Sequence, residues 1–397
     1  MFLSNKCQSI EEPLTIGMSR RSREMAQKGI QVINLSLGEP DFNTPEPIKQ
    51  AAIQAIQENF SHYTAVSGYL ELRQAICEKF KRDNNLIYTP DQIVVSTGAK
   101  QSIANVYIAL LNPGDEVIIP APYWVTYAEF LKLVDAKPVI IQTSLETNFK
   151  VSADVLEKHI TPKTKAIIFS SPSNPTGSIY TKEELSEWVK VLEKYPQIFI
   201  ISDEIYEHIN YVGKHFSIAQ FESIKERVAV INGVSKGYAM TGWRGGILAG
   251  PRWLAQACDK IQGQFTSATC SITQKAMHKA MEIDVETYVK PMVKAFQSRR
   301  DLVINKLKDI PGFKCNIPDG AFYVFIDITQ LFGKKYKDQT IKSGTDLCFY
   351  LLEEARVSLV PGAAFGNDNY IRLSYATSEE LLDKALNQIK NAILQLQ

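Results

Sequence analysis

The sequence predicts an α/β fold with a mostly parallel, seven-stranded sheet and a smaller α+β domain. Three observations lead to this expectation. Short runs rich in β-branched residues recur between residues 93 and 249, and helical patterns separate several of them. Most of these runs are apolar at consecutive positions, as expected for strands that are buried on both faces. Beyond residue 285, longer helical patterns replace this alternation.

The strands of the large sheet are expected where Val, Ile and Ala cluster. Helices are expected between them at 101–111, where apolar residues recur at helical spacing, and at 181–194. Thr181 and Glu184 match a capping box at the start of the second helix. The expected strands are Ile93–Ser96, Glu116–Ile119, Val139–Gln142, Ala166–Ser170, Ile198–Ser202, Val228–Ile231 and Gly246–Ala249.

The last third of the chain is expected to supply most of the smaller domain. A charged amphipathic helix at 285–310 leads to an apolar and aromatic run at 321–328, which is typical of a strand. The polar, Lys-rich segment 333–343 is expected to form a mobile surface loop. The remaining expected elements are a helix at 344–355, strands at 357–360 and 370–374, and a closing helix at 379–396.

The composition excludes several classes of protein. The chain has 397 residues, and its 44 basic and 43 acidic side chains leave a formal net charge of +1. This balance disfavours nucleic-acid binding through bulk charge and a polybasic membrane anchor. No run of about 18 apolar residues occurs, so no transmembrane helix is expected. Met1–Pro13 lacks the apolar core of a signal peptide.

The six cysteines are expected to be free thiols in a reducing, cytoplasmic compartment. No two of them form a CxxC pair, and no Cys or His cluster has zinc spacing, so no metal site is expected. Because free cysteine behaves as a small buried hydrophobe, packing alone is expected to explain their presence.

Residues that can carry chemistry follow the ends of five expected strands. They are Gly98 at the start of a helix, Trp124, Asn174, Asp203 and Lys236. Ligands of open α/β sheets bind outside the carboxyl ends of the strands, so these residues are expected to meet at one edge. Each has an ordinary explanation when taken alone: Trp124 could belong to the core, and Lys236 could be a surface residue.

Together these residues match the needs of pyridoxal phosphate. A helix N-terminus can bind its phosphate, and a lysine can form a Schiff base with its aldehyde. An acid can pair with the ring nitrogen, and an aromatic side chain can cover the ring face. The set therefore predicts a pyridoxal phosphate site.

Other classes of protein fit the residues less well. The segment 233–237 matches the G-x-S-x-G motif of serine hydrolases, with Ser235 as the nucleophile. That fold needs an acid and then a histidine after the serine, and the chain offers only Asp259 followed by His278. No helix-turn-helix segment or basic tract indicates a regulator, and no G-x-G-x-x-G indicates dinucleotide binding.

Five motifs make the chain similar to the fold-type I, class I aminotransferases, and most of all to bacterial aspartate aminotransferases with a short N-terminus. The resemblance covers essentially all of the chain. It implies a three-layer, cofactor-binding large domain at 42–290 and a small α+β domain built from both termini, at 1–41 and 291–397. The motifs are GEPDF at 38–42, SPSNPTG at 171–177, SDEIY at 202–206, SKGYAMTGWR at 235–244 and YIRLSYA at 370–376.

The resemblance implies roles in holding the cofactor. Lys236 would form the Schiff base and then move the proton at the substrate Cα, while Asp203 would pair with the ring nitrogen. Tyr206 and Asn174 would bind the ring oxygen, and the bond from Asn174 to Pro175 would be a cis-proline turn. The implied catalytic residues are Lys236, Asp203 and Tyr206. The implied cofactor-binding residues are Gly98, Ala99, Lys100, Trp124, Asn174, Asp203, Tyr206, Ser235, Lys236 and Arg244, together with the partner subunit's Tyr63.

The resemblance also implies the substrates. Arg372 would bind the α-carboxylate as a bidentate fork, with Gly38 opposite, and Lys100 would pair with the side-chain carboxylate of aspartate or glutamate. Lys100 could instead point to solvent, and Thr15 aligns only loosely with a substrate-side hydroxyl. The implied substrate-binding residues are Gly38, Lys100, Trp124, Asn174 and Arg372.

The implied reaction is ping-pong amino transfer from aspartate or glutamate to 2-oxoglutarate or oxaloacetate, in a homodimer with shared active sites. A bifunctional aspartate/prephenate enzyme, a broader enzyme for aromatic or branched oxo acids, and β-elimination stay open, since prephenate also carries a second carboxylate.

In one respect the chain departs from the family. Many members have a phosphate-binding serine three positions before the lysine, where this chain has Gly233.

Overall fold

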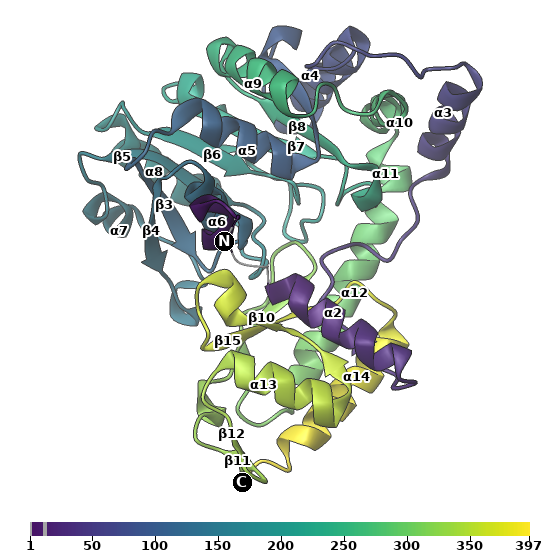
Figure 1. The fold of residues 1–397 in the computed structure, drawn as a ribbon, viewed down its shortest axis with the longest axis vertical. Helices are drawn as coiled ribbons and strands as arrows, with labels where there is room; N and C mark the ends of the chain where they lie inside the picture. The colour runs from purple at the N-terminus through teal and green to yellow at the C-terminus, as the bar shows by residue number, and fades with distance from the viewer. Residues whose placement is uncertain (1, 11–13) are drawn as a thin grey trace.

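The chain folds into a larger and a smaller part, which lie one above the other in Figure 1. The structure is a computed structural model that describes residues 2–10 and 14–397. The larger part holds a seven-stranded sheet, and the smaller part holds a four-stranded sheet and the C-terminus. The predicted fold class is therefore confirmed.

The large sheet has the strand order β2-β8-β7-β6-β5-β3-β4. Only β8 runs antiparallel to its two neighbours, β2 and β7, and the other neighbouring pairs are parallel. All seven predicted strands are present, most of them extended by one or two residues. They are β2 (Ile93–Thr97), β3 (Glu116–Ala121), β4 (Lys137–Gln142), β5 (Thr164–Ser170), β6 (Phe199–Asp203), β7 (Val228–Gly233) and β8 (Gly245–Ala249).

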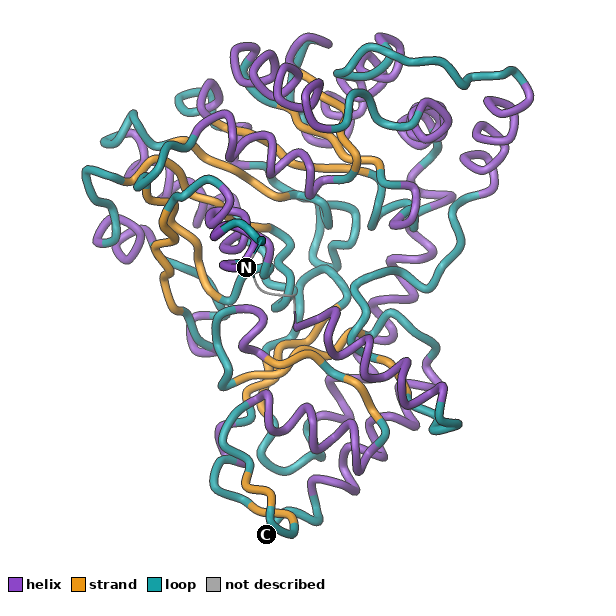
Figure 2. The backbone as a smooth tube through the Cα atoms, in the orientation of Figure 1, coloured by secondary structure: helices purple, strands orange, loops and turns teal. Residues whose placement is uncertain are grey.

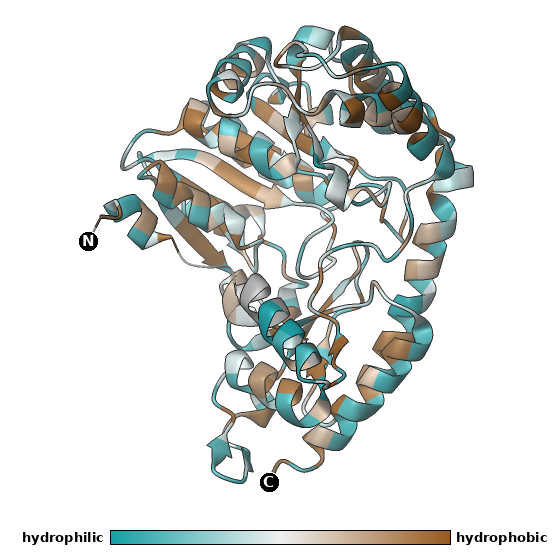
Figure 3. Ribbon diagram, turned by 45° about the vertical axis from the view of Figure 1, so that its right-hand side comes forward, coloured by the Kyte–Doolittle hydropathy of each residue, from teal (hydrophilic) through white to brown (hydrophobic). Residues whose placement is uncertain are grey.

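Apolar residues at consecutive positions let the sheet bury both of its faces. Ile167 and Ile200 belong to one hydrophobic cluster, and their neighbours Ile168 and Ile201 belong to a second cluster on the opposite face. The strands are accordingly brown for much of their length in Figure 3. Two layers of helices cover the faces, which gives the predicted three layers.

One face of the sheet is covered by helices that include α4 (Leu70–Asn84), α8 (Lys182–Glu193) and α10 (Ser271–Glu282). The other face is covered by α5 (Ala99–Leu110), α6 (Thr126–Leu133) and α9 (Arg252–Phe265). The predicted capping box opens α8, since the Glu184 N–H donates to Thr181 Oγ1 at 3.2 Å and the Thr181 N–H donates to Glu184 Oε2 at 2.8 Å. The helices α3 (Glu46–Gln57) and α7 (Ala153–Lys158) complete this part.

The smaller part combines both ends of the chain. The strand β1 (Ile33–Asn34) pairs in parallel with β13 (Val357–Ser358), and α2 (Leu14–Gln27) lies across the same region in Figure 1. Its main sheet has the order β14-β15-β10-β9. These strands are β9 (Lys314–Cys315), β10 (Tyr323–Asp327), β14 (Val360–Pro361) and β15 (Tyr370–Ser374), accompanied by α12 (Lys290–Leu307), α13 (Gly344–Tyr350) and α14 (Glu379–Ile393). The short helix α11 (Val285–Tyr288) lies beside α10, at the larger part, in Figure 1.

In four places the structure of this part differs in detail from what the sequence predicts. The helix expected at 285–310 is divided at Val289, where Pro291 in the first turn of α12 has no N–H to continue the ladder. The strand expected at 357–360 is two strands with different partners, β1 and β15. The helix expected at 344–355 ends in a π-helical turn, Leu351–Ala355.

The fourth difference concerns the segment 333–343, which is a hairpin and not an irregular loop. Its strands are β11 (Lys335–Tyr336) and β12 (Gln339–Thr340), and Lys337 in the turn has φ +53°. The main chain of Lys335 also exchanges two hydrogen bonds with Gln397. Hydrogen bonds to Gln397 therefore order a segment whose polar composition alone does not predict regular structure.

The predicted domain boundaries stay a prediction. At the N-terminus, α1 (Asn5–Ser9) lies against the larger part, because Lys6 Nζ donates to the Leu133 carbonyl at 2.9 Å and pairs with Asp135 at 2.8 Å. No helix in the described part of the chain is both long enough and apolar enough to span a membrane.

All six cysteines are unpaired, as predicted. Cys77, Cys258 and Cys348 are buried, whereas Cys7 and Cys270 are exposed. Packing therefore does not account for the two exposed thiols, and that expectation was wrong for them.

Candidate active site

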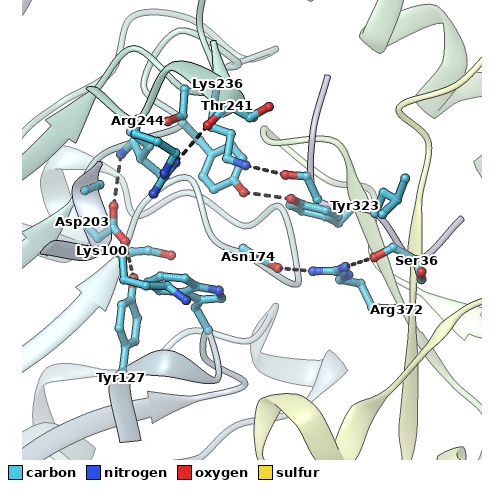
Figure 4. Close-up of a pocket in the computed structure, with 18 of the residues that line it drawn as sticks. Ser36, Lys100, Tyr127, Asn174, Asp203, Lys236, Thr241, Arg244, Tyr323 and Arg372 are labelled. Carbon is cyan, nitrogen blue, oxygen red and sulfur yellow. Dashed lines mark hydrogen bonds between the residues drawn. The ribbon is translucent and has the colours of Figure 1, made fainter. Parts of the chain in front are cut away.

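A cavity of about 390 Å³ lies between the carboxyl end of the large sheet and the smaller part. Loops, teal in Figure 2, join the two parts in this region. The structure brings most of the predicted site residues together on the cavity wall, as Figure 4 shows. Those that line it are Gly38, Ala99, Lys100, Trp124, Asn174, Asp203, Tyr206, Ser235, Lys236, Arg244 and Arg372.

Asp203 is a buried carboxylate at the end of β6. It is 4% exposed and accepts hydrogen bonds from the Tyr127 hydroxyl at 2.6 Å and from the Ile205 N–H at 3.2 Å. Burial raises the pKa of Asp203 to about 6, although the bond from Tyr127 acts in the opposite direction. Because a nearby cation would favour its charged form, this carboxylate is suited to a cationic ring nitrogen.

Lys236 faces Asp203 across the cavity, from the loop after β7. Its Nζ donates a hydrogen bond to the Gly38 carbonyl. Burial lowers the pKa of Lys236 to about 8, and the positive charges of Arg372 and Arg244 act in the same direction. A substantial fraction of this amine is therefore uncharged near neutral pH, as a nucleophile or a general base requires.

The lowered pKa of Lys236 predicts a stability effect in the ligand-free protein. The unfolded chain takes up this proton near the ordinary value of 10.5, whereas the folded chain takes it up only near 8. The free energy of unfolding therefore falls as pH drops from 10.5 to 8, and stays low below that. Lys236→Met should raise it by about 2–3 kcal/mol at pH 7.

Urea unfolding of the ligand-free protein at pH 7 and at pH 9.5 measures this effect. The advantage of Lys236→Met should be clearly smaller at pH 9.5, and the exposed Lys260→Met should change neither value. An equal advantage at both pH values would mean that packing, not the lysine charge, causes it.

Arg372 is a buried guanidinium on β15 and is 3% exposed. Its Nη2 donates to the Ser36 carbonyl at 2.7 Å, and its Nη1 donates to Asn174 Oδ1 at 3.0 Å. The Tyr323 ring lies 4.5 Å from Cζ. Among the residues that the structure describes, Arg372 Nε has no hydrogen-bond partner. A carboxylate entering the cavity can satisfy this donor with a charge-assisted bond.

Tyr206 and Tyr323 connect the two parts of the molecule. Their hydroxyl groups lie 2.8 Å apart and both rings are buried. Burial raises the pKa of the Tyr206 hydroxyl well above its ordinary value, so it stays protonated at neutral pH and can donate a hydrogen bond.

The start of α5 is suited to bind an anion. Its first amides have no partner within the helix, and the positive end of the helix dipole points the same way. Gly98, at φ +82°, precedes the helix, and a Cβ there would lie 2.8 Å from Arg244 Cζ. Glycine therefore lets the Arg244 guanidinium lie against the helix start. This cradle and the acid–lysine pair fit a phosphorylated aldehyde such as pyridoxal phosphate.

Lys100 lines the cavity, although it is exposed to solvent in part. Its Nζ lies 5.0 Å from the centroid of the half-buried Trp124 ring, which also lines the cavity. Burial, and then the charge of Arg244, lowers the pKa of Lys100. Lys100 thus lines the cavity while its side chain stays exposed to solvent, and its pairing with a substrate carboxylate stays a prediction.

Other predicted residues lie elsewhere. Gly98 does not line the cavity but sits behind Arg244, and Tyr63 is 99% exposed on this chain. The Thr15 side chain lies outside the described residues. At Gly233, a Cβ would lie 2.7 Å from the Gly245 carbonyl, so packing against β8 explains the missing serine. The bond from Asn174 to Pro175 is cis, as the resemblance implies.

Several cavity residues were missed by the sequence reasoning. Tyr127 lies just beyond Trp124 in the first turn of α6, and Tyr323 stands in a run of apolar and aromatic residues, so neither carries a distinct signal. The residues missed are Arg23, Ser36, Leu37, Tyr127, Ser170, Ile205, Thr241 and Tyr323.

The serine hydrolase alternative does not fit the cavity. Ser235 lines it, but Asp259 and His278 do not. His278 instead lies 3.4 Å from Glu282, one turn along α10. Neither Asp259 nor His278 therefore stands beside Ser235 as a triad requires.

Comparisons with known proteins agree with this geometry. The family model "Aminotransferase class I and II" matches residues 30–389. A probable aspartate/prephenate aminotransferase from Rickettsia felis is 47% identical over 98% of this chain and 96% of its own. The solved aspartate aminotransferase from Rhizobium meliloti is 42% identical, with a TM-score of 0.97 and 100% of each chain covered. The Thermus thermophilus aspartate aminotransferase with maleate is 36% identical, with a TM-score of 0.93 over 99% of this chain and 100% of its own.

Proposed function

The chain belongs to the class I and II aminotransferases, and from this premise we propose that it is a pyridoxal phosphate-dependent aspartate aminotransferase. It transfers the amino group of aspartate or glutamate to 2-oxoglutarate or oxaloacetate. One observation carries the proposal. A single cavity holds the Lys236–Asp203 pair together with two cations, Arg372 and Lys100, which suits a substrate with two carboxylates.

The residues present fit the cofactor. Lys236 would bind its aldehyde and Asp203 its ring nitrogen, with Tyr206 and Asn174 on the ring oxygen and Trp124 on the ring face. The phosphate would lie at the start of α5. Its ligands would be the amides of Ala99 and Lys100, the Ser235 side chain and the Arg244 guanidinium. When bound, the cofactor supplies a protonated ring that accepts electrons from the substrate Cα.

The chain's own residues bind the substrate and move its proton. Arg372 orients the α-carboxylate, and the Gly38 carbonyl opposite is in place to hold the freed Lys236 amine. With its lowered pKa, that amine can take the proton from the substrate Cα near neutral pH. Asp203, kept in place by Tyr127, stays charged above pH 6 and stabilises positive charge on the ring.

The smaller part supplies both Arg372 and Tyr323, and its movement would exclude water from the cavity. We also propose that the enzyme is a homodimer, because Tyr63 is fully exposed on one chain and would complete the partner's phosphate site. The six unpaired cysteines favour a reducing compartment such as the cytoplasm.

The proposed function is tested by reconstituting the purified chain with pyridoxal phosphate and supplying a panel of amino donors with 2-oxoglutarate. Aspartate should give glutamate and oxaloacetate faster than alanine or phenylalanine gives its products. If the reconstituted protein formed no glutamate from aspartate, the proposal would be wrong.

Lys100 determines the preference for acidic substrates in this proposal. A cation in this position has a partner only when the substrate carries a second carboxylate. Lys100→Ala should therefore lower kcat/KM for aspartate by about 10²-fold, while alanine loses less than about threefold. Steady-state kinetics on both donors measure this difference. Lys260→Ala, on the exposed face of α9, is the control. Equal losses on aspartate and alanine would remove the basis for an acidic substrate.

Prephenate is a second candidate acceptor. The Rickettsia felis relative is named for both aspartate and prephenate, and prephenate carries two carboxylates for the same two cations. Aspartate with prephenate should then give aminated prephenate in the reconstituted enzyme. Its absence would restrict the function to aspartate and glutamate.

A further inference from the structure

A buried network of charged residues lies behind the cavity wall formed by Asp203 and Tyr206. Its members are 7% exposed or less, apart from the half-buried His208, and none of them lines the cavity. The reaction as described uses none of them. They are Lys79 on α4, Glu204, Glu207 and His208 in the segment after β6, and His215 in the loop beyond.

Glu207 ties this segment to α4. Its carboxylate forms an ion pair with Lys79 and accepts a hydrogen bond from Asn84 Nδ2 at 2.6 Å. Lys79 Nζ also donates to Asn84 Oδ1 at 2.8 Å, which closes a three-membered network. Burial acts to raise the pKa of Glu207, but the attraction of Lys79 outweighs it and holds that pKa well below its usual range. Glu207 is therefore charged at neutral pH.

Glu204 ties the same segment to the loop at 215–217. Its Oε1 accepts hydrogen bonds from the Ser202 hydroxyl at 2.8 Å and the Ser217 hydroxyl at 2.7 Å. Its Oε2 lies 2.9 Å from His215 Nε2. The Glu207 N–H in turn donates to the Glu204 carbonyl at 2.9 Å, so both carboxylates belong to one turn of the backbone.

His208 extends the network to the segment that carries Lys236. Its Nε2 lies 3.2 Å from the Tyr238 hydroxyl, and the two rings are 5.3 Å apart. A Cβ at Gly237 would lie 2.7 Å from His208 Cδ2, so the ring packs directly against the residue after Lys236.

The side chains on the turn from 203 to 208 point in two directions. Asp203 and Tyr206 face the cavity, while Glu204 and Glu207 point the other way into the network. We propose that the buried Lys79–Glu207 ion pair is a positioning device, which fixes Tyr206 and, through His208, the segment of Lys236. This inference rests on the proposed function, since it assigns the network to the residues that would hold the cofactor.

Two readouts distinguish positioning from a purely structural role. The first is the pH dependence of Lys236 acylation in the cofactor-free protein, followed by mass spectrometry. The charges that act most on the pKa of Lys236 are those of Arg372, Glu39, Arg244 and Asp203. Glu207 is not among them, so a shift that persists when the Lys79 charge is removed together with the Glu207 charge reports a change of position. The second readout is the split between kcat and KM of the reconstituted enzyme.

Glu207→Gln keeps the shape of the side chain but removes its charge. We expect it to shift the acylation midpoint of Lys236 by at least half a pH unit from its value of about 8, and to lower kcat at least tenfold with KM changed less than twofold. Lys79→Met combined with Glu207→Gln leaves no unpaired charge. This double variant should regain the lost melting temperature but neither kcat nor the midpoint.

The control is Leu386→Ala, which removes buried packing in α14 and has no contact with the network. It should lower the melting temperature and leave kcat and the Lys236 midpoint unchanged. If Glu207→Gln does not fold, Tyr238→Phe removes only the hydroxyl that pairs with His208 and should shift the midpoint in the same way.

The inference is overturned if the Lys236 midpoint of the folded variants equals that of the wild type, or if Leu386→Ala shifts it equally. A wild-type chain without transaminase activity would overturn the proposed function instead, and the acylation measurement would still decide the inference.

Discussion

Lys236→Ala is expected to abolish amino transfer, with kcat reduced by at least about 10⁴-fold. The lysine has two tasks in the proposed reaction, since it binds the cofactor aldehyde and moves the proton at the substrate Cα. No other amine in the described cavity wall can replace it, because Lys100, the other lysine there, lies against Trp124. Turnover of aspartate with 2-oxoglutarate, measured after reconstitution, gives the reduction.

The reconstituted wild type should have a visible absorbance that borohydride reduction removes. Lys236→Ala should lack this absorbance. Mass spectrometry after reduction should find the cofactor on residue 236 in the wild type and no cofactor on any residue of Lys236→Ala. Lys100→Ala is the matched control, because it removes a lysine from the same cavity and should keep the absorbance. A coloured, reducible Lys236→Ala protein would contradict the assignment of this lysine.

The central sheet could be predicted from the sequence because most of its strands contain an uninterrupted run of apolar residues. Ile198–Ile201, for example, has no polar residue that another arrangement could expose, so its only suitable place is a sheet covered on both faces. Partners are less predictable where they come from distant segments. The strand expected at 357–360 is split because Val357 pairs with Ile33, more than three hundred residues away, while Val360 pairs with Arg372.

The site was predictable where a residue follows a strand end. Asp203 is the last residue of β6 and Lys236 follows β7, and the parallel register of the two strands brings these ends to one edge of the sheet. Tyr323 could not be predicted in the same way. It comes from a strand of the smaller part, and only the packing of the two parts brings its hydroxyl to 2.8 Å from Tyr206.

Tyr127 illustrates a second limit. Its helical position and full burial are typical of a core aromatic residue, and the sequence does not show that its hydroxyl meets Asp203. A buried carboxylate such as Asp203 needs a partner, and either a cation or neutral hydrogen-bond donors can supply it. Only the three-dimensional arrangement decides between them.

Asp203→Asn is expected to lower kcat/KM for aspartate by about 10²–10³-fold while leaving the fold intact. Asparagine has the same shape: its Oδ1 can still accept the hydrogen bond from the Ile205 N–H, and its Nδ2 can donate to the Tyr127 hydroxyl oxygen, so the cavity wall keeps its geometry. In the proposed reaction it loses the negative charge that would pair with the ring nitrogen, and with it the stabilisation of charge during proton transfer. Steady-state kinetics from pH 5 to pH 9 measure both the size of the loss and its pH dependence.

The pKa of Asp203 predicts how the pH profile of kcat/KM changes in each variant. The pKa of Asp203 is raised to about 6, so protonation below that pH removes its charge, and a bound cationic ring moves this limit lower. Wild-type kcat/KM should therefore fall on the acid side, whereas Asp203→Asn should lack this limb. Tyr127→Phe keeps the carboxylate but removes a bond that lowers its pKa, so its acid limb should move to higher pH with a smaller loss of rate. An acid limb that is the same in all three proteins would assign it to another group and exclude Asp203 as the residue that carries this charge.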